Sequence, residues 1–332
     1  MDFELSDDEV ALAEGMRRLC AGRFPLERLR ASEGERVVVD PAGWAELAEA
    51  GVFALRVPEA SGGLGLDMAA ASVVFEELGR ALVPGPLVSS HLAAGLLDRA
   101  GVAEGKLVVG AIVRPHADRD RTASVVPVVI GHLESLGLLL VVTDDGVYGI
   151  DPSALDAVPV ERSLDPLTPL WHVQQLPEGE KIGGADEAAR FTREFRVLEG
   201  ALLVGMAAAT VDLAVDYAKH REQFGHPIGS FQAVKHLCAD MLVRGEVARA
   251  AVHAAAVTLD QPDMGDPERA ASGAALLAAE AALANGKTCI QVHGGMGFTW
   301  EVPAHLYVMR ARVVAASLGH LGDLAEFVAE RY

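Results

Sequence analysis

Three long segments rich in alanine and leucine dominate the second half of the chain and restrict what it can fold into. They cover residues 187–221, 231–257 and 267–292, and in each of them the apolar residues recur with a helical period. Asp266 and Pro267 precede the third segment as an N-cap followed by proline at the first helical position. Short loops join the segments, which brings helix ends together at the tip of a bundle. The sequence therefore predicts a C-terminal helical bundle over residues 186–332.

The rest of the chain divides into a helical part and a part with short strands. Ser6 is a candidate N-cap before an acidic first turn, and "PAGWAELAEAG" and "MAAASVVFEELGRALVP" indicate further helices. From Lys106 onward, β-branched runs alternate with turn residues, and residues 144–146 indicate a hairpin turn. The predicted fold is mainly α with a small β domain: an N-terminal helical domain over 1–105, a β domain over 106–185 and then the bundle.

The charge balance excludes two classes of partner. The chain carries 28 basic and 47 acidic residues, a formal net charge of −19. Non-specific binding to nucleic acid or to anionic membranes needs a basic surface, so neither is expected. The sequence has no uncharged run of about 18 apolar residues, which is the length that a membrane span needs.

The cysteines and the N-terminus favour a cytoplasmic setting. Cys20, Cys238 and Cys289 are widely spaced and form no CxxC pair, which suits a reducing compartment. The acidic N-terminus lacks the basic and apolar blocks of a signal peptide. His293 and His320 have no second ligand at a recognisable spacing, so no metal site is expected.

The loop between the first two bundle segments contains residues that suit a nucleotide. Arg221 can form two parallel bonds to a phosphate, and Gln223 can donate or accept a hydrogen bond beside it. Phe224 can cover a ring, and Gly225 lets another backbone come close. Two interpretations remain open from the residue types alone. The loop is either a grip for a dinucleotide or a capped helix turn with an ordinary surface arginine.

Two motifs are similar to signatures of the acyl-CoA dehydrogenase family. One is "YAKHREQFGHPIGSFQAVKHLCADM" at 217–241, and the other is "CIQVHGGMGFTWEVPAHLYVMRAR" at 289–312. The N-terminal "VPEASGGLGLD" and "FEELGRALVPGP" resemble the family as well. The resemblance covers nearly the whole chain. It implies the family's fold, with a β-barrel-like middle domain and a C-terminal four-helix bundle.

The resemblance also implies a reaction and a cofactor. Family members use FAD to oxidise acyl-CoA thioesters to 2-enoyl-CoA, and a carboxylate removes the α-proton. In the family, FAD lies across a subunit interface, where an RxxFG loop and a QxxGG turn reach the flavin nucleotide of the neighbouring subunit. Carried over to this sequence, with Gln223 added from the loop, the cofactor-binding residues are Arg221, Gln223, Phe224, Gly225, Gln291, Gly294 and Gly295.

This sequence departs from the family at the flavin ring and at the base. The Thr-Glu-Pro…Gly-Ser-Asp and Trp-Ile-Thr-Asn-Gly stretches of the family's β domain are missing. Phe195 and Leu318 occupy the two positions where family members carry the base, and neither can take a proton. Glu199, one helical turn after Phe195, is the remaining candidate, with a solvent-facing or arginine-paired glutamate as the alternative. Arg196 matches a family arginine near the CoA chain.

The pattern of kept and lost parts resembles the short subunit of acyl-CoA dehydrogenases that assemble from two unlike chains in bacterial steroid and branched-acyl degradation. This resemblance implies a longer homologous partner that carries the base, an acyl-CoA substrate, and electron-transfer flavoprotein or a similar acceptor. Two alternatives stay open. One is a homo-oligomeric enzyme with Glu199 as a relocated base, and the other is a flavin-free CoA-binding or scaffold subunit.

Overall fold

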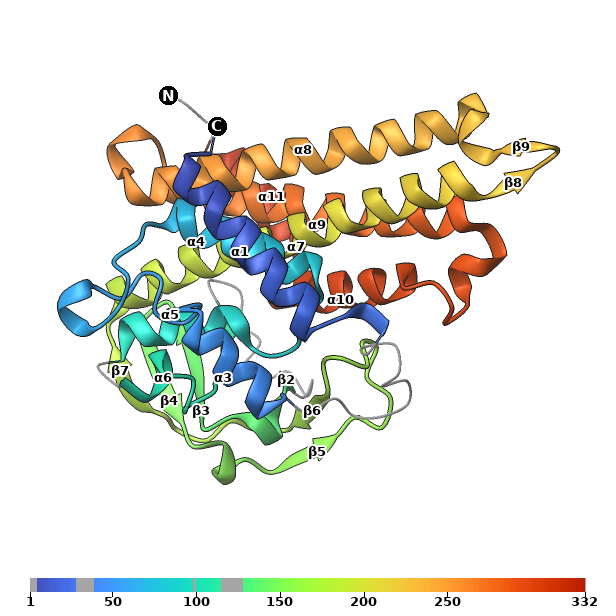
Figure 1. Cartoon of the computed structure of the whole chain (residues 1–332). Coiled ribbons are helices and arrows are strands. Elements are labelled where there is room, and N and C mark those ends of the chain that lie inside the picture. Colours follow the sequence, from blue (N-terminus) through green and yellow to red (C-terminus); the bar gives the residue numbers. More distant parts are fainter. Residues whose placement is uncertain (1–4, 28–38, 98–99, 115–127, 332) are drawn as a thin grey trace.

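The computed structural model describes residues 5–27, 39–97, 100–114 and 128–331. Two helical parts lie on either side of a small β part along the sequence, and in space the long helices of the second half lie above the sheets (Figure 1). The predicted fold class, mainly α with a small β domain, is confirmed. The boundaries at 105/106 and 185/186 remain proposed domain limits.

The N-terminal part begins with well-capped helices. They are α1 (Asp7–Arg23), α3 (Pro41–Glu49), α4 (Met68–Arg80), α5 (Leu87–Leu96) and the short α6 (Ala100–Ala103). Ser6 caps α1 as predicted, and Glu9 completes a capping box by accepting the Ser6 backbone N–H at 2.7 Å. Gly51, with φ of +83°, follows the end of α3.

The β part contains two small sheets. The first has the order β1 (Val109–Val113), β3 (Leu138–Thr143), β4 (Gly146–Ile150) and β7 (Glu180–Gly183), in which only the β1–β3 pair is parallel. The second is antiparallel and has the order β2 (Val128–Gly131), β6 (Leu170–Val173) and β5 (Ala157–Pro159). The predicted turn at residues 144–146 joins β3 to β4, with Thr143 opposite Gly146.

The C-terminal part is a bundle of long helices. It contains α7 (Ala185–His220), α8 (Gln232–Asp260), α9 (Pro267–His293), α10 (Ala304–Ser317) and α11 (Leu321–Glu330). The Asp266 side chain accepts hydrogen bonds from the N–H groups of Glu268 and Arg269, so the predicted N-cap of α9 is confirmed. By length and composition α7 could cross a membrane, but 72% of its most apolar 18-residue window is buried inside the protein. It is a core helix.

Helix α10 was not among the predicted helices. Its sequence mixes buried aromatic, aliphatic and arginine residues, so the helical period of apolar residues is weak there. Leu306, Tyr307, Arg310 and Ala311 are all buried in α10. The helix is therefore fixed by packing on α9 and α7 more than by an amphipathic pattern of its own.

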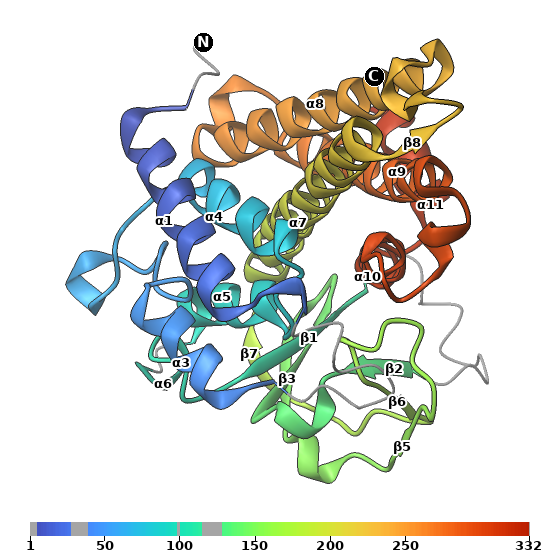
Figure 2. The same cartoon turned by 45° about the vertical axis from the view of Figure 1, so that its right-hand side comes forward.

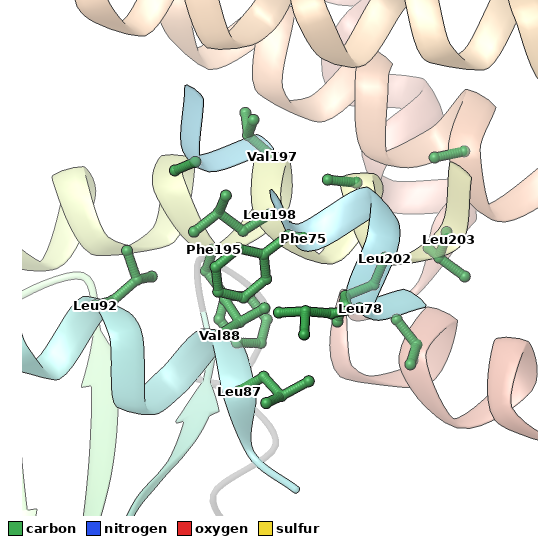
Figure 3. Close-up of a cluster of buried hydrophobic side chains, with 14 of the residues drawn as sticks. Phe75, Leu78, Leu87, Val88, Leu92, Phe195, Val197, Leu198, Leu202 and Leu203 are labelled. Carbon is green, nitrogen blue, oxygen red and sulfur yellow. The ribbon is translucent and has the colours of Figure 1, made fainter. Parts of the chain in front are cut away.

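The core is centred where α4 and α5 meet α7. Figure 3 shows Phe75 and Leu78 of α4, Val88 of α5, and Phe195 and Leu202 of α7 packed together. Two glycines let α4 and α7 approach closely. A Cβ at Gly205 would lie 1.9 Å from the Glu76 carbonyl oxygen, and one at Gly79 would lie 2.1 Å from that of Leu202. The lack of a side chain at Gly79 and Gly205 thus sets how closely α4 and α7 can pack.

Candidate functional site

The loop between α7 and α8 folds as a two-residue β-hairpin at the end of the bundle. Its strands are β8 (Glu222–Gln223) and β9 (His226–Pro227), and the turn consists of Phe224 and Gly225. Both turn residues have positive φ, +56° and +81°, as a type I′ turn requires. The hairpin projects from the bundle tip, far from the sheets, in both views (Figures 1 and 2).

The side chains of this hairpin face solvent. Phe224 is 90% exposed and contacts the Phe231 ring edge-on, with centroids 6.2 Å apart. Arg221 is exposed, and it forms no ion pair within the part of the chain that the structure describes. The Gln223 side-chain amide donates to the Glu222 carbonyl at 2.6 Å. An exposed phenylalanine in the left-handed region costs about 1–3 kcal/mol, and such strain is typical of functional sites.

The second motif lies at the same end of the bundle. Helix α9 ends at His293, and a 3₁₀ turn over Gly294–Phe298 follows. Tyr217, one turn before the hairpin, stacks on His293 with centroids 4.3 Å apart, and its hydroxyl lies 3.7 Å from the Met296 sulfur. The structure therefore brings together two motifs that are about 70 residues apart in sequence.

The exposed backbone at these turns fits a nucleotide. A Cβ at Gly225, Gly294 or Gly295 would meet no atom within 4 Å, and Gln291 is exposed beside them. Glycine backbone that another molecule can approach closely, at the same end of the bundle as an exposed arginine, suits the phosphates of a nucleotide. Phe224 and the glycines of both turns face solvent in the part of the chain that the structure describes.

A cavity of about 930 Å³ lies elsewhere, between the sheets, α7 and α10. Its wall is mostly apolar and comes from α4, the α4–α5 connection, α5, strands β1, β2, β3 and β6, and the helices α7 and α10. Figure 2 shows α10 above the β part, with β1 and β2 below it. Arg221, the C-cap of α7, lies 22 positions after Glu199, which corresponds to about 33 Å along the helix axis. The hairpin thus cannot reach the cavity of its own chain.

Glu199 lines this cavity and is partly buried. Among the described residues, its carboxyl group forms neither a hydrogen bond nor an ion pair that would offset its burial. Loss of water raises the pKa of Glu199 to about 8, against an opposing effect of the Arg310 charge. Glu199 is therefore mostly protonated at pH 7.

The two family positions for the base hold apolar side chains. Phe195 lines the cavity and is only 3% exposed, stacked at 6.2 Å on Phe191. Leu318, 5% exposed, caps the end of α10 between the cavity-lining residues Ser317 and Gly319. Neither position offers an atom that can accept a proton.

Arg196, which the resemblance places near the CoA chain, contacts two residues of α9. It is 6% exposed, donates to the Ser272 hydroxyl at 3.1 Å and lies 3.5 Å from the Glu268 carboxylate. Arg193 also pairs with Glu268, at 2.8 Å. These contacts join α7 to α9, and Arg196 is not among the residues that line the cavity, so a substrate role for Arg196 stays a prediction.

Sequence reasoning missed a polar group in the cavity wall. Arg310 of α10 pairs through Nε with Asp165 and donates through Nη1 to the Val83 carbonyl at 3.2 Å. Asp165 also accepts from the Thr168 hydroxyl at 2.6 Å, and burial lowers the pKa of the adjacent His132 to about 3. Asp165 and Arg310 are 145 residues apart, so no local pattern pointed to the pair.

Residues 6–107 match the N-terminal domain of the acyl-CoA dehydrogenases, and residues 183–332 match their C-terminal domain. The chain belongs to the acyl-CoA dehydrogenase family. Two acyl-CoA dehydrogenase-like motifs and the order of the domains had predicted this assignment, which is confirmed. The family consists of FAD-dependent oxidoreductases.

Individual relatives of this acyl-CoA dehydrogenase differ in length. The chain is 33% identical to acyl-CoA dehydrogenase IpdE2 of Mycolicibacterium smegmatis, covering 95% of this chain and 96% of that protein. It is 37% identical to FadE34 of Mycobacterium tuberculosis over 84% of this chain, but spans only 40% of FadE34. The fold superposes on a chain of the ChsE4-ChsE5 complex of M. tuberculosis with a TM-score of 0.86 and 22% identity, over 99% and 98% of the chains.

Proposed function

We propose that this chain is a subunit of an FAD-dependent acyl-CoA dehydrogenase and supplies the interface half of an FAD site to a partner chain. The observation that carries the proposal is the β8–β9 hairpin. It holds Phe224 90% exposed at a φ of +56°, beside the exposed Arg221 and the open glycine turn at 294–295. Strain and exposure of this kind are typical of a binding site, which supports a bound molecule at the hairpin.

In this arrangement each residue of the chain has a binding task. The Arg221 guanidinium would hold a phosphate of the nucleotide, Phe224 would cover a ring, and the glycines would let the backbone approach. FAD supplies the hydride acceptor for the oxidation of an acyl-CoA thioester to its 2-enoyl form. The α-proton would be taken by a carboxylate of the partner, because Phe195 and Leu318 cannot accept it.

The partner that we propose is a longer homologous acyl-CoA dehydrogenase subunit. One solved relative in this fold is the ChsE4-ChsE5 complex, which supports an assembly of unlike chains. The further parts of the proposal are a cytoplasmic location, an acyl-CoA from the degradation of a steroid side chain or a branched acyl chain, and electron-transfer flavoprotein or a similar acceptor.

Co-purification tests the proposal. The chain is produced alone and together with a longer acyl-CoA dehydrogenase chain as the candidate partner, and bound FAD is measured per chain by absorbance after gel filtration. We expect FAD in the complex and none on the chain alone. A chain that purifies yellow by itself contradicts the proposal and favours the homo-oligomer. A complex that stays colourless favours the flavin-free scaffold.

A second candidate function rests on the position of Glu199. It lies in the wall of the 930 Å³ cavity, as a relocated base of a homo-oligomeric enzyme would have to. With its pKa raised to about 8 by burial, such a base would be active only as the pH rises toward and above 8. Glu199→Gln in the flavin-loaded complex separates the two candidates. Turnover that falls less than about tenfold leaves the base with the partner, and a collapse by about 10²–10⁴-fold moves it to this chain.

A further inference from the structure

The exposed phenylalanine and tryptophan side chains of the described residues lie together at one end of the bundle. They are Phe224, Phe231, Phe298 and Trp300, with exposed fractions of 90%, 38%, 79% and 37%. All other described phenylalanine, tyrosine and tryptophan side chains are buried or half-buried. The exposed ones belong to two segments, the hairpin with the start of α8 and the stretch that follows α9 (Figure 1). The contact of Tyr217 with Met296 joins these segments into one surface.

Two of the four aromatic side chains have no task in the proposed flavin site. That site uses Phe224 and the glycine turns, and Phe231 contacts the Phe224 ring. Phe298 is the last residue of the 3₁₀ turn after α9, and the ring of Trp300 lies edge-on to that of His305 with centroids 4.5 Å apart. Exposed aromatic side chains that gather in one patch are typical of a surface that another protein covers.

The charge at this end of the bundle is opposite in sign to the charge of the whole chain. The chain has a formal net charge of −19, but residues 217–236 contain three lysine and arginine residues against a single acidic residue, Glu222. The three are Lys219, Arg221 and Lys235, and all are exposed. This local basic surface attracts an acidic surface, whereas the rest of the chain repels one. The charges therefore favour a partner with an acidic rim.

We propose that Phe298 and Trp300, surrounded by the basic residues of the hairpin, form the surface on which the partner chain docks, and that this contact forms without flavin. The occupant is the longer acyl-CoA dehydrogenase chain, through an apolar face with an acidic rim. A buried aromatic side chain removes on the order of 150–250 Å² from water, and this contribution does not depend on FAD. The inference rests on the proposed function, to which it adds the surface that holds the two chains together.

The first experiment measures association in the absence of flavin. This chain and a longer acyl-CoA dehydrogenase chain as the candidate partner are both freed of flavin, and their binding is followed by surface plasmon resonance. We expect saturable association, and Phe298→Ala should weaken it about thirtyfold or more, as the loss of a central aromatic contact does. Val158→Ala is the matched control, because Val158 is 62% exposed on β5, and it should bind like the unmodified chain.

A second variant tests the charge and does not depend on the folding of Phe298→Ala. Lys235→Glu, at an exposed position of α8, should slow association about three- to tenfold at low salt and leave the dissociation rate nearly unchanged. The difference from the unmodified chain should shrink as the salt concentration rises, because salt screens exposed charges. An association rate that is the same in both chains at low salt contradicts the role of the basic residues.

The outcomes separate this inference from the proposed function. Association that appears only when FAD is added overturns the inference and leaves the flavin half-site intact, and so does equal binding by Phe298→Ala and Val158→Ala. A complex that depends on Phe298 but stays colourless with FAD supports the docking surface and contradicts the proposed function. Self-association of this chain through Phe298 overturns the assignment to an unlike partner. No association with or without FAD overturns both.

Discussion

Single residues of the hairpin support the proposed function more directly than the residues that line the cavity do. Phe224 has a left-handed backbone that a bulky side chain rarely adopts, and Gly225 after it makes the tight turn possible. In the described part of the chain, the Phe224 ring touches Phe231 edge-on and otherwise faces solvent. The hairpin therefore presents the Phe224 side chain to solvent and not to the core of its own chain.

Arg221→Ala should weaken FAD retention in the assembled enzyme by roughly tenfold or more and leave the fold intact. A charge-assisted hydrogen bond contributes about 1.5–3 kcal/mol, and Arg221 has no ion pair in the described structure whose loss would unfold it. Flavin titration of the apo-complex measures the effect. Arg18→Ala, at a 74%-exposed side chain on α1, is the matched control. Equal flavin affinity of both variants would contradict a role for Arg221.

Glu199 should make the stability of the chain fall as the pH rises. Its pKa is about 8 in the folded chain, above the ordinary value of 4.5. The folded state therefore binds more protons than the unfolded state between these values, and the stabilisation is present below pH 4.5 and lost as the pH rises through 8. Urea unfolding from pH 5 to pH 9 should show a loss on the order of a few kcal/mol. Glu199→Gln should lack this component, and an identical pH slope in both chains would exclude the raised pKa.

At the scale of elements, the crossing of α4 and α7 positions both the cavity and the bundle. Gly79 and Gly205 bring the two helices to near backbone contact, and the Figure 3 cluster packs beside the crossing. Asp260, the last residue of α8, also accepts hydrogen bonds from the Met68 and Ala69 N–H groups at the start of α4. The N-terminal part is thus joined to the bundle through the backbone of α4.

Gly205→Ala should lower the free energy of unfolding by about 3 kcal/mol, because the new methyl group would lie 1.9 Å from the Glu76 carbonyl oxygen. Gly273→Ala is the matched control, since a Cβ there meets nothing within 4 Å on helix α9. The control should raise stability by about 0.5–1 kcal/mol through helix propensity. Denaturant unfolding measures both, and similar values for the two variants would show that the crossing can open without cost.

At the scale of the whole molecule, the two ends of α7 serve different purposes. The N-terminal half lines the cavity and packs on the N-terminal helices, whereas the C-terminal end carries the hairpin (Figure 1). About 33 Å of helix separates Glu199 from Arg221, so a flavin held by the hairpin lies outside the reach of this chain's own cavity. This separation supports the proposal that the hairpin completes an FAD site in another chain.

The isolated chain, supplied with FAD and acyl-CoA, should show no substrate-dependent bleaching of the flavin. Phe195 and Leu318 leave both base positions without a proton acceptor, and a positioned base contributes about 10²–10⁴-fold to the rate. Absorbance near the flavin maximum under anaerobic conditions measures the reaction. The assembled complex is the positive control. Bleaching by the chain alone, abolished in Glu199→Gln, would assign the base to this chain.

The sequence by itself determined the features that depend on neighbouring residues. The helical period of 187–221, 231–257 and 267–292, the caps at Ser6 and Asp266 and the hairpin turn at residues 144–146 all reflect local backbone preferences. The family followed from two short motifs and the order of the domains. The helical periods, the caps and the turn were predictable because each is decided within a few residues along the chain.

Only the tertiary structure decided which way the side chains of α7 point. The middle of this helix, residues 195–211, is buried on nearly all sides, so no polar face there fixes the rotation of the helix. Packing against α4 and α9 turns Arg196 toward Ser272 and Glu268 and leaves Glu199 in the cavity wall. The pairing of Asp165 with Arg310 likewise depends on how the sheets dock against α10. Contacts between distant segments follow from the packing of the whole core, which a single sequence does not encode in any local pattern.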